Sequence, residues 1–263
     1  MRMANMPPLM MKPAMPVSLS PSSLPQARER DAVSLREFHI NAQAVFVHED
    51  TEGLSAAAAQ RVAELAAQAI AARGVFHIAL AGGATPRRCY EKLRRLPVDW
   101  EHVQVYFGDE RCLPAGDAGR NDRMARETLL EHIAIPPDNI HAIPAELGAR
   151  EAAARYAAML ENAAPLDLVL LGMGEDGHIA SLFPGNPATD SKALAVPVFN
   201  APKPPPERVS LGMVTLNAAR QRIFLVAGAG KRDALGQMLL GKSLPAACIA
   251  AAEWHLDRAA LSG

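Results

Sequence analysis

The feature that most constrains the fold is an alternation of short apolar runs with longer segments of helical periodicity along most of the chain. The candidate strands are residues 75–81, 103–107, 166–171, 209–216 and 222–227. The candidate helices are residues 55–73, 86–95, 121–134, 150–162 and 231–240. Strands that alternate with helices predict an α/β fold, a doubly wound, mostly parallel open sheet with helices on both faces.

The first candidate helix carries signals at both ends. Ser55 is a residue type that caps helix N-termini, and Gly74 is the type that most often ends a helix. We therefore expect the helix to begin at a Ser55 cap and to stop at Gly74. In the folds that this pattern predicts, ligands bind beyond the carboxyl ends of the strands, so the residues there are the candidate site.

Residues 1–37 differ from the rest of the chain. Six of the 11 methionines and six of the 21 prolines precede residue 26, and the prolines interrupt any continuous apolar helix of the kind a secretory signal needs. We expect a disordered leader or a start assigned too far upstream, with a targeting or docking tail as the alternative. Residues 38–263 are expected to form a single α/β domain.

Charge and cysteine content exclude several classes of function. The 27 Lys and Arg residues against 28 Asp and Glu residues leave a net charge of −1, which argues against binding driven by nucleic-acid charge. The three cysteines form neither a disulfide framework nor a metal-site spacing, which favours a reducing compartment, the cytoplasm. No apolar run has membrane-spanning length. We expect no cofactor, no metal, no nucleic-acid partner and no membrane.

Two glycines follow the first candidate strand. Gly82 and Gly83 allow close backbone approach to a ligand, Thr85 adds a hydroxyl, and the following helix directs its free N–H groups to the same place. This pattern predicts a cradle for a phosphate or carboxylate. The alternative is a tight turn that needs glycine for its own geometry.

Three charges follow the second candidate strand. Asp109 or Glu110 is suited to acid–base chemistry, and Arg111 is suited to gripping an anion. A solvated turn with a local ion pair remains the alternative at this position.

The stretch after the third candidate strand is the most informative. Residues 172–178 place three glycines around two carboxylates and one imidazole. His178 titrates near neutral pH and is suited to taking a proton from water, with Asp176 close enough in sequence to orient it. The alternative is a helix start at which Asp176 caps and His178 is incidental.

Three further cations stand near strand ends. Lys203 lies in a proline-rich segment that presets the backbone, Arg208 begins the next candidate strand, and Lys231 lies at a helix start, where a cation is locally unfavourable. Such placement indicates an anionic partner. A linker and exposed, solvated side chains are the alternatives. Together the strand ends supply several anion grips and one base, as expected of an enzyme acting on a small phosphorylated molecule.

These motifs, in this order, resemble the 6-phosphogluconolactonase family, within a larger group that includes glucosamine-6-phosphate isomerase. The resemblance runs from about residue 38 to the C-terminus, and its most specific block is the glycine-histidine stretch. The matching segments are LAGGATP (80–86), FGDER (107–111), NDRMARETLL (121–130), LDLVLLGMGEDGHIASLFPG (166–185), PKPPPERVSL (202–211) and GKRDAL (230–235).

The resemblance implies hydrolysis of 6-phosphoglucono-1,5-lactone to 6-phosphogluconate, the second step of the oxidative pentose phosphate pathway, without a metal. It implies that His178 is the general base and that Asp176 and Asp109 are its polar supports. It implies that Gly82, Gly83 and Thr85 cradle the phosphate, and that the cations Arg111, Lys203, Arg208 and Lys231 supply charge either to the phosphate or to the developing oxyanion. One departure is Ala84, where the family usually has a hydroxyl residue, which predicts a modestly weaker phosphate grip.

Two rival functions are weighed against this one. The isomerases of the larger group continue their histidine motif with Ile-Ala-Phe-Asn-Glu-Pro, whereas this chain continues through Ser181 and Leu182 and lacks that glutamate. A phosphosugar sensor needs the anion grip but not the base, so His178 argues against it. We expect a monomer or weak oligomer whose one partner is the small phosphosugar lactone.

Overall fold

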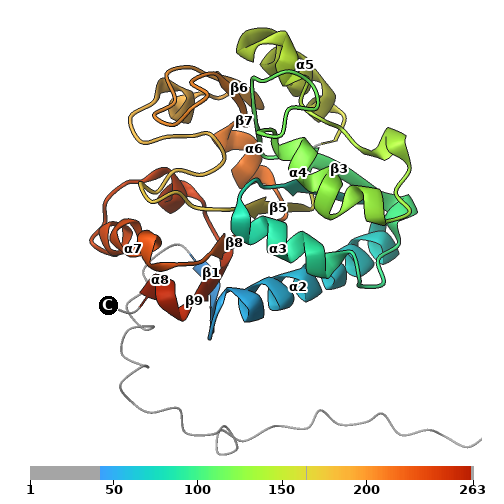
Figure 1. Ribbon diagram of the computed structural model, residues 1–263, viewed down its shortest axis with the longest axis horizontal. Coiled ribbons are helices and arrows are strands. Elements are labelled where there is room, and N and C mark those ends of the chain that lie inside the picture. The colour runs from blue at the N-terminus through green and yellow to red at the C-terminus, as the bar shows by residue number, and fades with distance from the viewer. Residues whose placement is uncertain (1–41, 164, 262–263) are drawn as a thin grey trace, which may run out of the picture. The chain divides into compact units, whose positions relative to one another are not determined.

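The computed structural model describes residues 42–163 and 165–261, so the expected leader at residues 1–37 lies outside the described residues. Six strands form one sheet in the order β1-β9-β8-β5-β2-β3, and every neighbouring pair is parallel (Figure 1). The strands are β1 (Ala42–His48), β2 (Phe76–Leu80), β3 (Val103–Phe107), β5 (Leu168–Leu171), β8 (Gln221–Val226) and β9 (Ala252–Asp257). The predicted open parallel sheet is confirmed.

A second, antiparallel sheet was not predicted. It has the order β4-β7-β6, with β4 (Asp109–Arg111), β7 (Arg208–Leu211) and β6 (Ala195–Val198). The strand expected at 209–216 is half wrong, because β7 ends at Leu211 and helix α6 (Met213–Ala218) follows. Gly212 separates the two elements, and a Cβ there would lie 2.0 Å from the carbonyl oxygen of Ala193. The turn is therefore set by close packing that an apolar pattern does not reveal.

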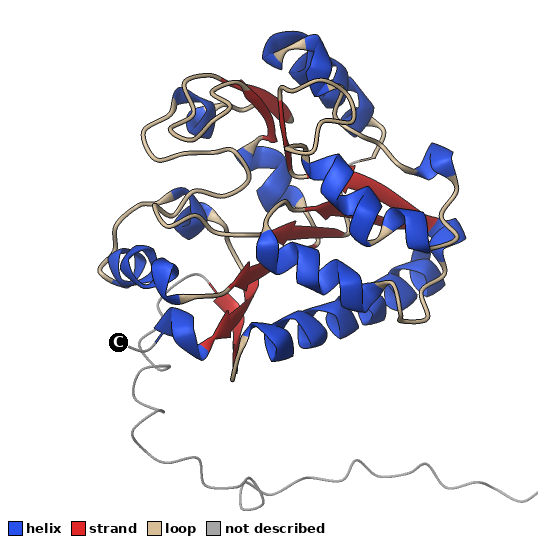
Figure 2. Ribbon diagram, viewed as in Figure 1, coloured by secondary structure: helices blue, strands red, loops and turns tan. Residues whose placement is uncertain are grey.

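The helices are α2 (Thr51–Arg73), α3 (Ala84–Leu93), α4 (Asn121–Thr128), α5 (Ala149–Glu161), α6, α7 (Arg232–Leu239) and α8 (Arg258–Leu261). Helices lie on both sides of the large sheet (Figure 2). Short 3-10 turns occur at Trp100–His102, Leu130–His132, Pro137–Asn139, Ala145–Leu147, Pro187–Asp190, Ala229–Lys231 and Pro245–Cys248. Within the described ranges, no helix has both the length and the apolarity that crossing a bilayer requires.

Two helix ends differ from the sequence expectation. The cap of α2 is Asp50, whose carboxylate accepts from the Gly53 N–H at 2.8 Å, and Ser55 lies inside the helix with its hydroxyl donating to the Thr51 carbonyl at 2.7 Å. Gly74 ends α2 in the left-handed conformation, as predicted. The segment expected as a helix to residue 134 leaves α geometry after α4, and only a single 3-10 turn continues it.

Strand order fixes where a ligand site forms. The chain passes from β2 to β3 on one side and later returns to place β5 on the other side of β2. The loops that follow β2 and β5 therefore diverge at the carboxyl edge of the sheet, the position at which open α/β sheets bind ligands. β5 is buried along its whole length and anchors this edge in the core.

Candidate active site

The loops after β2, β3, β5 and β8 surround a cavity of about 330 Å³, here called the active cavity. Eight residues singled out from the sequence line it: Gly82, Gly83, Asp109, Arg111, His178, Lys203, Arg208 and Lys231. Two do not. Thr85 lies in the first turn of α3 away from the wall, and Asp176 stands behind His178. The fold therefore gathers side chains that are up to about 150 positions apart in the chain.

His178 is held by Asp176. Its Nδ1 lies 2.5 Å from the Asp176 carboxylate, and its backbone N–H donates to the same oxygen at 3.3 Å. Burial lowers the pKa of His178, and the hydrogen bond and charge of Asp176 act in the opposite direction without reversing the shift. The ring also packs on Phe183 with centroids 4.5 Å apart. Burial therefore favours the neutral imidazole, and the contact with Asp176 engages Nδ1.

Glycine at position 174 is required for this pair. A Cβ there would lie 2.0 Å from Nδ1 of His178 and 2.5 Å from Oδ1 of Asp176. Gly177 adopts φ of 78°, which lets the loop turn back so that the Gly174 N–H donates to the His178 carbonyl at 2.8 Å. The glycines of this motif therefore serve a close approach and a tight turn.

The two neighbouring carboxylates after β3 do different things. Asp109 faces the active cavity, whereas Glu110 is 1% exposed and points away from it. Glu110 accepts hydrogen bonds from the N–H groups of Asn121 at 2.7 Å and Asp122 at 2.8 Å, so it caps the start of α4. Burial raises the pKa of Glu110 to about 7 despite these bonds. Of the two alternatives left open by the sequence, Asp109 lines the active cavity and Glu110 does not.

Four cations surround the active cavity, and none of them forms a salt bridge to a carboxylate of the described chain. Arg208 is buried on β7 and donates to the carbonyl oxygens of Lys203 at 2.8 Å and Pro205 at 3.1 Å. It thereby holds the proline-rich segment in place. Arg111 donates to the Gly119 carbonyl. Burial lowers the pKa of Lys231. A wall whose cations form no such salt bridge suits an anionic ligand.

Two buried residues of this site were not singled out from the sequence. Asn121, expected only as the start of a helix, lines the active cavity and donates to Asp109. Ser181 donates to the same carboxylate from the loop after β5. Both occur inside segments that resemble the family, and this resemblance was the one sequence feature that could have pointed to them. Serine and asparagine are common residues, and the sequence does not show which distant residue each one contacts in the fold.

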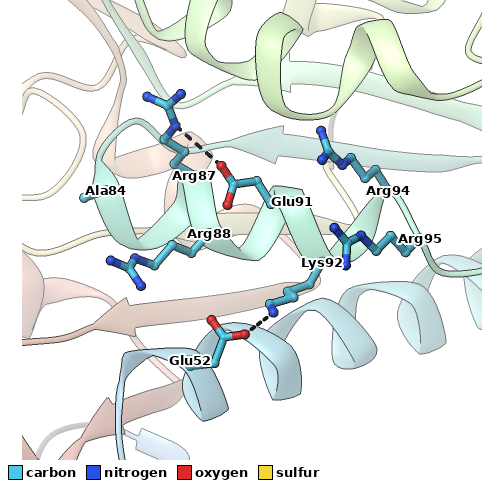
Figure 3. Close-up of a pocket in the computed structure, with 8 residues that line it drawn as sticks. All are labelled: Glu52, Ala84, Arg87, Arg88, Glu91, Lys92, Arg94 and Arg95. Carbon is cyan, nitrogen blue, oxygen red and sulfur yellow. Dashed lines mark hydrogen bonds and ion pairs between the residues drawn. The ribbon is translucent and has the colours of Figure 1, made fainter.

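A second hollow of about 390 Å³ lies on the outer face of α3 (Figure 3). We call it the α3 hollow. It is lined by Glu52, Ala84, Arg87, Arg88, Glu91, Lys92, Arg94 and Arg95. Lys92 reaches across to Glu52 of α2, and Arg87 pairs with Glu91 at 3.7 Å. Ala84, where the family usually has a hydroxyl, belongs to this hollow and not to the wall of the active cavity.

No group of three or more His, Cys, Asp or Glu residues in the described chain is arranged to hold a metal ion. The active cavity instead combines a neutral imidazole, a fixed carboxylate and four cations around glycine-rich loops. This set suits proton abstraction beside a bound anion.

Comparison with known proteins defines the class. The family model for glucosamine-6-phosphate isomerases/6-phosphogluconolactonase matches residues 49–257, and the chain belongs to this family. Solved structures agree on the fold. A 6-phosphogluconolactonase from Thermotoga maritima superposes with a TM-score of 0.77 at 27% identity, covering 82% of this chain and 99% of that one. A monomeric glucosamine-6-phosphate deaminase superposes with a TM-score of 0.74, and its 22% identity speaks to the fold alone.

Curated relatives place the chain within the family. A 6-phosphogluconolactonase from Mycobacterium leprae is 35% identical over 237 residues, covering 82% of this chain and 96% of that protein. One from Streptomyces coelicolor is 35% identical over 241 residues, covering 82% and 92%. The chain groups with the 6-phosphogluconolactonases and is an enzyme of the hydrolase class in carbohydrate metabolism.

Proposed function

We propose that the chain hydrolyses 6-phospho-D-glucono-1,5-lactone to 6-phospho-D-gluconate, the second step of the oxidative pentose phosphate pathway, with His178 as the general base. Relatives named 6-phosphogluconolactonase support the reaction. The observation that carries the role of His178 is its geometry: a neutral imidazole, bound to Asp176 through Nδ1, on the wall of a cavity with four cations.

The first chemical step forms a tetrahedral intermediate. Nε2 of His178 takes a proton from water while the water oxygen attacks the lactone carbonyl carbon, and the carbonyl oxygen becomes an oxyanion. Asp176, bonded to Nδ1, stabilises the imidazolium that results. A cationic wall lowers the cost of the oxyanion because its charges are already in place before the reaction.

The second step opens the ring. The oxyanion re-forms a carbonyl, the bond to the ring oxygen breaks, and that oxygen leaves with the proton that His178 carries. One water is consumed and one carboxylic acid is produced, so His178 ends the cycle neutral. The acid then ionises in solution and releases a proton, which makes the reaction measurable by titration.

The phosphate of the substrate is held away from the reacting carbon. We assign its binding to the loop of Gly82 and Gly83 at the start of α3, whose first turn contains Thr85. The cations Arg111, Lys203, Arg208 and Lys231 divide between the phosphate and the oxyanion. A helix start suits a dianion because its N–H groups are unpaired and its dipole is positive.

We further propose that the protein works in the cytoplasm as a monomer or weak oligomer. The three cysteines Cys89, Cys112 and Cys248 are all free in the structure, which suits a reducing compartment.

The test is turnover of the lactone by the purified protein, followed as acid release and corrected for spontaneous hydrolysis. His178→Ala lowers kcat by about 10²- to 10⁴-fold, the usual contribution of a general base. The variant retains binding of 6-phosphogluconate. His132→Ala is the matched control, because that exposed ring bonds only to the Glu127 carbonyl and leaves activity unchanged. Full activity of His178→Ala refutes the base, and no turnover by the parent protein refutes the function.

A further inference from the structure

Both oxygens of the Asp109 carboxylate are engaged. Oδ1 accepts from the Asn121 side-chain amide at 3.0 Å, and Oδ2 accepts from the Ser181 hydroxyl at 2.6 Å. Asp109 is only 6% exposed although it lines the active cavity. This carboxylate has little freedom to rotate, because rotation would break at least one of its two hydrogen bonds. Hydrogen bonds accepted by a charged carboxylate are stronger than those between neutral groups.

The two donor residues, Ser181 and Asn121, are themselves held by hydrogen bonds from their backbone N–H groups. Ser181 is fully buried, and its N–H donates to the hydroxyl of Ser210 on β7 at 3.2 Å. Asn121 is 5% exposed, and its N–H is held by Glu110 at 2.7 Å. The carboxylate is therefore clamped between the loop after β5 and the start of α4.

Asn121 also contacts the proposed phosphate loop. A Cβ on Gly82 would lie 2.1 Å from Oδ1 of Asn121, so the amide packs directly on the backbone at this glycine. The same side chain donates to the backbone carbonyl of Asp109 at 2.9 Å. Asn121 thus links two segments, the loop proposed to bind phosphate and the strand β4 that carries the carboxylate, whereas the Ser181 hydroxyl donates to the carboxylate.

We propose that Ser181 and Asn121 are positioning residues that hold the Asp109 carboxylate as a fixed negative charge in the cavity that His178 also lines, and that Asn121 also sets the position of the Gly82 loop. The inference rests on the proposed function. In this arrangement the charge of Asp109 stabilises the imidazolium that forms when His178 takes a proton from water. Both hydrogen-bond donors are neutral, so they hold the carboxylate without adding a further positive charge beside it.

The two positions predict different kinetic effects. Ser181→Ala frees one carboxylate oxygen and leaves the phosphate loop untouched, so kcat falls about tenfold while KM stays within about twofold. Ser181→Cys fills the same space with a weak donor and has the same effect, which separates the hydrogen bond from packing. Asn121→Ala lowers kcat about tenfold and also raises KM, because the Gly82 loop loses its support.

Two matched controls remove the same kinds of side chain at positions outside the active cavity. Ser55→Ala removes another fully buried hydroxyl, the one that donates to Thr51 inside α2. Asn217→Ala removes another side chain with two hydrogen bonds to backbone, at Cys248 and Ala250. Each control loses hydrogen bonds outside the active cavity, so we expect its melting temperature to fall. We expect its kcat and KM to stay unchanged.

The outcomes separate this inference from the proposed function. No lactone turnover by the parent protein overturns both. Parent turnover with normal kcat in Ser181→Ala, Ser181→Cys and Asn121→Ala overturns the inference alone. Equal changes of KM in the Ser181 and Asn121 variants overturn the assigned link between Asn121 and the Gly82 loop. The inference is supported if the Ser181 variants lower kcat alone, Asn121→Ala changes both kcat and KM, and the two controls keep normal kinetics.

Discussion

The active cavity and the α3 hollow are similar in volume, about 330 and 390 Å³, and both are rich in cations. They differ in how those charges are held. The α3 hollow is lined mainly by exposed side chains of one helix, with ion pairs such as Arg87–Glu91 on its surface. The active cavity is lined by several loops together with β4 and β7. Its Asp109 and Arg208 are buried and bonded to neutral donors and to backbone carbonyls, and its half-buried His178 is bonded to Asp176.

This difference teaches that volume and charge do not define a site of chemistry. Groups on one exposed helix face relax with solvent, so they stabilise a developing charge weakly. Groups fixed by several loops are oriented before the reaction starts, which is the condition for electrostatic catalysis. Three variants or conditions test the comparison.

The largest effect is expected at Gly174. Gly174→Ala places a methyl group within 2.5 Å of both members of the His178–Asp176 pair, which must then separate or shift. A displacement of about 1 Å costs about 10²-fold, so we expect kcat to fall at least that far. Steady-state kinetics with lactone measures it.

Its matched control is Gly236→Ala. This glycine lies inside α7 with no atom within 4 Å of a Cβ position, so activity is unchanged and the free energy of unfolding rises by about 0.5–1 kcal/mol. Normal kcat in Gly174→Ala would show that the His178–Asp176 pair tolerates a displaced loop. The proposed difference between a rigid active cavity and a solvent-relaxed α3 hollow would then be wrong.

The second effect is pH dependence. His178 must be neutral to act as a base, and its pKa is lowered from 6.5, chiefly by burial. The value of kcat/KM is therefore full at pH 7 and falls about tenfold per pH unit below a midpoint lower than 6.5. Asp176→Asn removes a hydrogen bond and a charge that raise this pKa, so the midpoint moves further down. A pH–rate profile measures both, and a midpoint above 6.5 contradicts the assignment.

The smallest effect is expected in the α3 hollow. The double variant of Arg88→Ala and Arg95→Ala removes two exposed cations of the α3 hollow, so kcat/KM changes by less than about twofold and the free energy of unfolding by about 0.5 kcal/mol or less. The matched double variant in the active cavity, Lys203→Ala with Lys231→Ala, raises KM by about tenfold or more. Equal changes of KM in both double variants would remove the distinction between the two hollows.

The strands predicted correctly from the sequence are those made almost entirely of apolar residues, because such runs indicate burial directly. β2, β3, β5 and β8 are apolar runs, and the structure has all four within one or two residues of the predicted ends. β9 was missed because three of its six residues, Glu253, His255 and Asp257, are polar, yet the whole strand is buried. Its Glu253 is bonded to Arg61 at 2.6 Å, a partner 192 positions away. Polar strands of this kind are satisfied only by contacts that the fold creates.

β4 and the cap of α2 were missed for a similar reason. β4 is the charged segment Asp109–Arg111, which has no strand pattern and is ordered by pairing with β7. Ser55 and Asp50 are both acceptable caps by residue type, and the position at which the chain leaves β1 decides between them.

The sequence by itself determined the parallel sheet, the edge at which its loops converge, and the glycine-histidine block that carries His178. These are local properties, since apolar periodicity and glycine at a turn act over a few residues. Only the tertiary structure decided that Asp109 faces the active cavity while Glu110 caps a helix, and that Ser181 and Asn121 hold Asp109. Ser181 and Asp109 are 72 positions apart, and which side chains meet at that distance depends on how every element between them packs.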